Sequence, residues 1–233
     1  MKIGCAALYP ITRYGFLYSL DNYLKAIAEI RAAGFDACEL EINVDVDLDE
    51  YIRRIDEVRA TLDKNHMTLS AVIGVVQQAF STDRAAADET LGRFERLCQF
   101  IEEVGGDTAC ICAYMPKEIE GVPGTELYRG SPPLQVRVPR GFDWNLFWVI
   151  PKLKRRLMYV HLADNDGTSS QHLPAGRGTL DFPRIFRSLE QIGYTGYANV
   201  DFGGVPADQI WDEVRRGRDY FERCLAEAEA VPK

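Results

Sequence analysis

The feature that most constrains the fold of this chain is a repeated alternation of short apolar runs with amphipathic helical patterns. Four such pairs follow one another before residue 116, and two more follow after residue 156. Consecutive βα units with short connections produce parallel strands covered by helices. Because crossovers between parallel strands are right-handed, the remaining choices are a (β/α) barrel and an open doubly wound sheet. The predicted strands are residues 3–9, 37–42, 69–74, 108–115, 157–163 and 197–202.

Capping residues mark several of the helices between these strands. Ser81 is expected to cap a long helix, and Asp181 is expected to cap a helix with Pro183 in its first turn. Another helix is expected from about Asp47, and the last helix over residues 207–229. These six units predict an α/β fold with a parallel sheet, which is either an open sheet or a TIM-type barrel that is incomplete by two of its eight units.

The regular alternation stops in the middle of the chain. Residues 116–141 contain five prolines and four glycines, and they predict a long loop of the kind that is functional or mobile in compact domains. Pro151 interrupts the helical pattern that follows this loop. We expect residues 1–233 to form a single (β/α)-barrel domain that carries this loop.

Composition and charge exclude several classes of protein. No run of 18 apolar residues is present, so no membrane span is expected. The formal net charge of −8 disfavours binding to nucleic acid or anionic membranes, which requires clustered Lys and Arg. Six cysteines are scattered without paired metal-ligand spacing, and the N-terminal run is too short and too broken for a signal peptide. These features indicate a cytoplasmic protein with reduced cysteines.

Reactive groups in a parallel βα fold gather at the carboxyl ends of the strands. His161 lies within an apolar strand, and strand alternation directs it into the barrel together with Tyr159. The same alternation directs Asp201 inward from the last strand, which predicts half of a divalent-metal site. Glu39 and Glu41 share the inward face of the second strand, where carboxylates need a cation, hydrogen bonds or water. A buried structural histidine and a salt-bridged polar layer are the alternatives at these positions.

The loop after His161 is dense in ionisable and hydroxyl groups, which suit the binding of a polyol. Asp164, His172 and Arg177 lie in it, and Arg177 can reach a phosphate or carboxylate from its Gly-Arg-Gly turn. Aromatic residues elsewhere can form apolar walls for a sugar ring, although such residues more often form core or subunit interfaces. They are Tyr9, Tyr114, Phe142, Trp144, Phe147 and Trp148.

Two segments carry a family resemblance: HLADNDG…HLPAGRGTLDFPRIFRSLEQIGYTGYANVDF and GFDACELEI. They resemble the xylose isomerase-like TIM-barrel superfamily of sugar phosphate isomerases and epimerases. The resemblance implies a divalent metal (Mn, Mg, Co or Zn) held by carboxylates on the fifth, sixth and eighth strands and a histidine on the seventh. His161 matches this histidine, and Asp201 stands where the family usually has Glu. No segment matches the family's fifth or sixth strand, so either about two βα units are lost or the sequence is incomplete relative to the family.

The resemblance implies a divalent-metal-dependent isomerase or epimerase of sugars or sugar phosphates. The metal would bind the carbonyl and the adjacent hydroxyl, while carboxylates remove and return the proton next to the carbonyl. The expected roles are catalysis for Glu39, Glu41 and Asp164, substrate binding for His172, Arg177, Tyr9 and Tyr114, and metal binding for His161 and Asp201.

Two other functions stay open on the sequence. A degenerate, non-catalytic barrel would bind a ligand or partner, unless residues 116–156 supply a replacement acidic ligand. A zinc phosphodiesterase of the AP-endonuclease branch needs a histidine-rich cluster and a basic face, which three histidines and a charge of −8 disfavour. The expected partners are a small sugar or polyol and a second copy of the chain, because missing units leave open strand edges. The candidate replacement ligands are Glu118, Glu120, Glu126 and Asp143.

Overall fold

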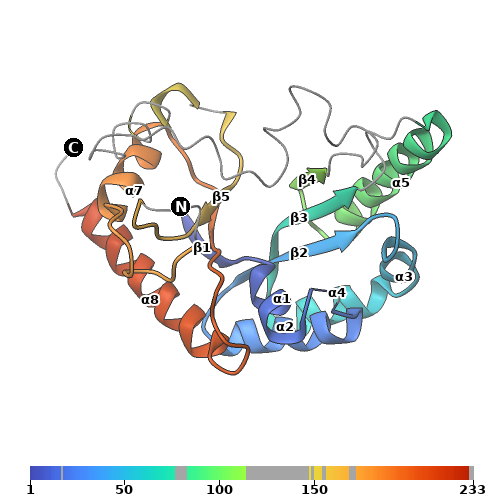
Figure 1. The fold of residues 1–233 in the computed structure, drawn as a ribbon, viewed down its shortest axis with the longest axis horizontal. Helices are drawn as coiled ribbons and strands as arrows, with labels where there is room; N and C mark the ends of the chain where they lie inside the picture. Colours follow the sequence, from blue (N-terminus) through green and yellow to red (C-terminus); the bar gives the residue numbers. More distant parts are fainter. Residues whose placement is uncertain are drawn as a thin grey trace.

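The computed structural model of the chain describes residues 1–16, 18–76, 83–113, 147, 150–153, 156–167 and 172–230. Within this part, six parallel strands form one sheet in the order β4-β3-β2-β1-β6-β5. The sheet curls, and its helices lie on the convex outer side (Figure 1). The predicted α/β fold of the barrel type with six βα units is thus confirmed. The strands are β1 (Lys2–Cys5), β2 (Ala37–Asn43), β3 (Thr68–Val76), β4 (Ala109–Ala113), β5 (Val160–Leu162) and β6 (Tyr197–Val200).

Side-chain caps define where several helices begin. Ser19 accepts a hydrogen bond from the N–H of Asn22 at the start of α2. Asp181 accepts one from the N–H of Arg184 at the start of α7, as the sequence predicts. No helix in the described part of the chain combines the length and apolar composition needed to cross a membrane. The helices are α1 (Leu8–Tyr14), α2 (Leu20–Ala32), α3 (Leu48–Arg53), α4 (Ile55–Asn65), α5 (Arg84–Glu103), α7 (Phe182–Gln191) and α8 (Ile210–Glu229).

Three predicted boundaries differ from the structure. The first strand ends earlier than expected, and Pro10 lies in the first turn of α1, where its missing N–H leaves no intrahelical bond unmade. The helix expected after residue 47 is divided at Arg54, whose guanidinium bonds Asp21 of α2. Asp83 caps α5, whereas Ser81 lies outside the described residues, as does the predicted loop over 116–141.

The central strand of the sheet, β1, lies between β2 and β6. Gly4 of β1 stands opposite Asn199 of β6, and a Cβ on Gly4 would lie 2.0 Å from Asn199 Oδ1. Glycine is therefore required at this position, because any side chain would collide with the Asn199 amide. The close approach leaves room for a fully buried amide inside the curl of the sheet.

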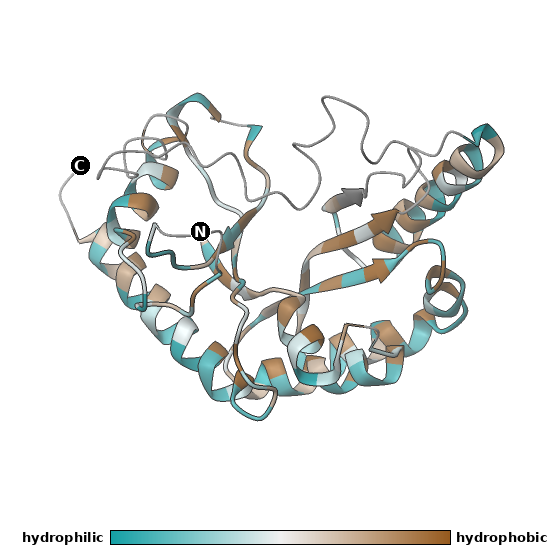
Figure 2. Cartoon of the chain, in the orientation of Figure 1, coloured by the Kyte–Doolittle hydropathy of each residue, from teal (hydrophilic) through white to brown (hydrophobic). Residues whose placement is uncertain are grey.

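The helices attach to the sheet through apolar faces, while their outer faces are hydrophilic (Figure 2). Phe182 of α7 packs edge to face against Phe221 of α8, with ring centroids 4.7 Å apart. Phe186 contacts the same ring, and all three side chains are buried. Burial of each ring contributes about 1.5–3 kcal/mol. This packing ties together the last two helices, which follow β5 and β6.

Candidate active site

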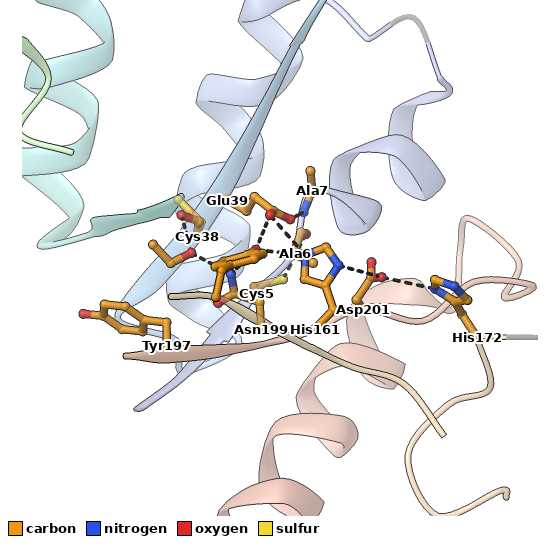
Figure 3. Close-up of polar contacts among 12 residues, drawn as sticks. Cys5, Ala6, Ala7, Cys38, Glu39, His161, His172, Tyr197, Asn199 and Asp201 are labelled. Carbon is orange, nitrogen blue, oxygen red and sulfur yellow. Dashed lines mark hydrogen bonds and ion pairs between the residues drawn. The ribbon is translucent and has the colours of Figure 1, made fainter. Parts of the chain in front are cut away.

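Side chains from two strands and from the residue that follows a third meet in one polar cluster (Figure 3). Glu39 comes from β2, His161 comes from β5, and Asp201 directly follows β6. His161 Nε2 lies 3.1 Å from Glu39 Oε1, and His161 Nδ1 lies 3.2 Å from Asp201 Oδ2. His172, in the loop after β5, places its Nδ1 3.1 Å from the same Asp201 oxygen. The structure thus brings together four residues that the sequence singles out.

Glu39 is the most deeply buried member of the polar cluster, with 1% of its surface exposed. Its Oε2 accepts a hydrogen bond from the N–H of Ala7 at 2.8 Å. Its Oε1 accepts one from the Tyr159 hydroxyl. Burying a carboxylate is costly without such donors. Glu39 is therefore held on both oxygens by groups from two separate parts of the chain.

The charges of the polar cluster shift the pKa values of its members. Burial acts to lower the pKa of His161, but hydrogen bonds with Asp201 and Glu39 outweigh it and raise this pKa to about 10. Burial acts to raise the pKa of Asp201, but hydrogen bonds from His161 and His172 hold it well below its usual range. The hydrogen bond with Asp201 also raises the pKa of His172. Opposite charges in contact thus stabilise one another here.

Glu41 is a second carboxylate of β2 that faces the polar cluster. Burial, and then the charges of Glu39 and Asp201, raise the pKa of Glu41, while the charge of His161 lowers it. Glu41 is only partly buried, unlike Glu39. A carboxyl group with a raised pKa exchanges protons more readily near neutral pH.

Two predicted substrate contacts have partners outside the polar cluster. The Tyr9 hydroxyl donates to Glu29 of α2 at 2.8 Å, and the Tyr9 side chain is buried. Arg177 pairs with Glu213 of α8, and about half of the Arg177 side chain is exposed (53%). Several other predicted residues lie outside the described residues: Tyr114, Glu118, Glu120, Glu126, Phe142, Asp143, Trp144 and Trp148.

Asp164 organises the loop after β5 through its buried carboxylate. Its two oxygens accept four backbone N–H groups, and its own backbone pairs with Leu173 across the loop. These bonds engage both oxygens and hold the segment that carries His172. The four donors are Asn165, Gly176, Gly178 and Leu180, at 2.9, 3.0, 2.9 and 3.3 Å.

Three residues support the polar cluster without a role predicted from the sequence. Tyr159 is expected to face inward, strand alternation gives Asn199 the same direction as Asp201, and Ser70 is not singled out. Asn199 Nδ2 donates to the Tyr159 hydroxyl oxygen and, at 2.8 Å, to Ser70 Oγ. The available signal for Ser70 was a lone polar residue inside the apolar third strand.

A separate cavity of about 460 Å³ opens at the amino ends of the strands, and Ser70 lines it. Reacting groups in βα barrels lie at the carboxyl ends instead. We therefore place the candidate active site at the polar cluster and not in this cavity.

Comparison with known proteins identifies the fold family. Residues 143–230 match the family described as xylose isomerase-like TIM barrel. The IOLI protein with a bound zinc atom aligns over 99% of this chain and 100% of its own, with 12% identity and a TM-score of 0.66. A xylose isomerase-like TIM barrel protein from Mycobacterium smegmatis in complex with magnesium aligns over 98% of both chains, with 16% identity and a TM-score of 0.65. The C-terminal part of the chain therefore matches this family, and the chain as a whole is similar in fold to these TIM-barrel proteins.

Part of the chain is also similar in sequence to a curated sugar-phosphate epimerase. It is 31% identical over 75 residues to the L-ribulose-5-phosphate 3-epimerase UlaE of Escherichia coli. This match covers 32% of the chain and 26% of the relative, so the chain spans about a quarter of the length of the curated relatives it matches.

Proposed function

We propose that this protein is a divalent-metal-dependent isomerase or epimerase of a small sugar or sugar phosphate. The observation that carries the proposal is the polar cluster, in which two histidines and two buried acids from β2, β5 and the segments after β5 and β6 meet. Support comes from the related ribulose-phosphate epimerase and from the zinc-bound and magnesium-bound structures of the same fold.

The donor set of the polar cluster fits a divalent ion by its chemistry. The Nδ1 atoms of His161 and His172 lie 3.2 and 3.1 Å from Asp201 Oδ2. Imidazole nitrogens and carboxylate oxygens are the ligand types that divalent-ion sites of this kind use. Among the described residues, no group of three or more His, Cys, Asp or Glu side chains is positioned to hold a metal ion. The proposal therefore rests on the types of these side chains and on their meeting at one place.

We assign the other catalytic and binding roles to residues around the polar cluster. A bound ion would stabilise the negative charge that develops when the carbon next to a carbonyl loses its proton. We assign the proton exchange to Glu41, which is partly exposed and has a raised pKa. We assign an orienting role to Glu39, whose two oxygens are already engaged, and to Asp164, which holds the loop of His172. The half-exposed guanidinium of Arg177 is the group we propose for a substrate phosphate.

Epimerisation assays on free ketoses and ketose phosphates test the proposed function. We expect turnover that requires Mn, Mg, Co or Zn, stops on addition of EDTA, and falls at least 100-fold in Asp201→Asn. His66→Asn is the matched control, because His66 is an exposed residue at the end of α4 with a left-handed backbone that Asn tolerates. Absence of turnover on every sugar, or equal turnover in Asp201→Asn, would contradict the proposal.

A barrel that binds a sugar without chemistry is the second candidate. The observation that favours it is that carboxylates engage both nitrogens of His161. Calorimetric binding of a ketose with no change in the sugar over days would support this candidate.

A further inference from the structure

A chain of hydrogen bonds crosses the interior of the curled sheet and ends at the polar cluster. Ser70 donates its hydroxyl proton to the Cys38 carbonyl, so its oxygen accepts from Asn199 Nδ2. Asn199 Nδ2 can only donate, so the Tyr159 oxygen also accepts from it. Tyr159 must then direct its own proton to the Glu39 carboxylate, which can only accept. The direction of each hydrogen bond in this series, from Ser70 to Glu39, thus follows from which atoms can donate and which can only accept.

His161 is the last member that this chain orients. Its Nε2 lies 3.1 Å from Glu39 Oε1 and 2.9 Å from the Tyr159 oxygen. With Glu39 as a carboxylate, neither group has a proton to give, so Nε2 is the donor in both contacts. Nδ1 is the nitrogen that faces Asp201. The proposed function needs a nitrogen that ligates the ion at this position.

Tyr159 contacts both His161 and Glu39. Its ring packs edge to face against the His161 ring, with centroids 4.9 Å apart. Its hydroxyl holds one oxygen of Glu39, while the N–H of Ala7 holds the other. Asn199, which donates to the Tyr159 hydroxyl oxygen, is fully buried.

We propose that Tyr159 is a positioning residue, which orients His161 through Glu39 so that Nδ1 is presented to a divalent ion. The part of this inference that concerns metal binding rests on the proposed function, whereas the orientation of His161 does not. Partners that orient a ligating histidine typically affect metal affinity or activity by about 10–100-fold when they are removed.

Tyr159→Phe tests the proposal by removal of one hydroxyl group. Tyr197→Phe is the matched control, because Tyr197 lies on neighbouring β6 and directs its hydroxyl away from the polar cluster (Figure 3). The first measurement is the side-chain ¹H–¹⁵N spectrum of the metal-free protein at neutral pH, with His161 assigned by its loss in His161→Gln. The second is the affinity for Zn and Mn by calorimetry.

We expect the His161 Nε2–H signal to shift or to exchange faster with water in Tyr159→Phe and to stay unchanged in Tyr197→Phe. We also expect metal affinity to fall at least tenfold in Tyr159→Phe and less than twofold in the control. An unchanged His161 signal would overturn the positioning role, whether or not metal binds. A shifted signal in a protein that takes up no metal would support the positioning role and contradict the proposed function.

A second variant, Glu39→Gln, tests the same proposal if Tyr159→Phe does not fold. Glu39→Gln keeps the shape of the side chain and its acceptor oxygen but removes the charge that faces His161. The same shift of the His161 signal is expected, and an unchanged signal in this folded variant would likewise overturn the proposal.

Discussion

The loop after β5 depends on one buried carboxylate, and replacement of Asp164 by Ala is expected to destabilise the fold strongly. Asp164 is 1% exposed, and its oxygens accept four backbone N–H groups at 2.9–3.3 Å. Alanine would leave these four donors without their acceptor. Hydrogen bonds to charged groups contribute about 1.5–3 kcal/mol each, and water that enters the truncated site offsets part of the loss.

Three of the four bonds are 3.0 Å or shorter, and the fourth, from Leu180, is longer at 3.3 Å. With about 1–1.5 kcal/mol retained for each of the three short bonds after water has entered, the expected loss is about 3–5 kcal/mol. This is a large share of the roughly 5–15 kcal/mol that stabilises an ordinary domain.

Urea denaturation followed by circular dichroism measures this loss as a fall in the transition midpoint. Asp56→Ala is the matched control, because the Asp56 side chain is 95% exposed. The control is expected to change the free energy of unfolding by less than about 0.5 kcal/mol. A loss below about 1 kcal/mol in Asp164→Ala would show that the four bonds do not hold the loop as described.

Three further predictions concern packing, pH and assembly. Gly217→Ala would place a Cβ 2.8 Å from the buried Phe202 ring and is expected to destabilise the protein. Gly92→Ala in α5 meets open space and is expected to stabilise it by about 0.5–1 kcal/mol. Changes of the melting temperature in the same direction in both variants would refute this pair of predictions. Burial raises the pKa of Tyr194 to about 12, so the folded state keeps a proton that the unfolded state loses above pH 10, and stability should fall as the pH rises from 10 to 12. Tyr194→Phe should reduce this fall, and equal slopes in urea titrations would count against it. Because β4 and β5 each pair with only one described strand, we expect a homo-oligomer, which a monomer in sedimentation equilibrium would exclude.

The sequence predicts the number and order of the strands because hydrophobic periodicity is local information. The cap at Asp181 is equally local, since it depends on residues within one turn of α7. Arg54, at which the predicted helix is divided, bonds Glu50 and Glu57 of its own segment and also Asp21 on another helix. No pattern within the segment itself predicts the contact with Asp21.

The same difference between local and long-range information applies to the polar cluster. Alternation within each strand predicts that His161 and Asp201 face the interior. The link from Ser70 to Asn199 joins residues 129 positions apart, and the bond from Ala7 to Glu39 depends on the sheet order. Such contacts are fixed by register and twist across the sheet, which a single sequence does not specify.

The measurement that tests the proposed function most directly is deuterium uptake from D₂O into a ketose, followed by proton NMR. Exchange of the C–H next to the carbonyl reports proton removal whichever stereocentre is inverted. The proposed function predicts metal-dependent loss of this proton signal with the wild-type protein, retention of the signal with His161→Gln, and wild-type behaviour in His66→Asn. Full retention of the signal across free and phosphorylated ketoses, or equal exchange with His161→Gln, would contradict an active site at the polar cluster.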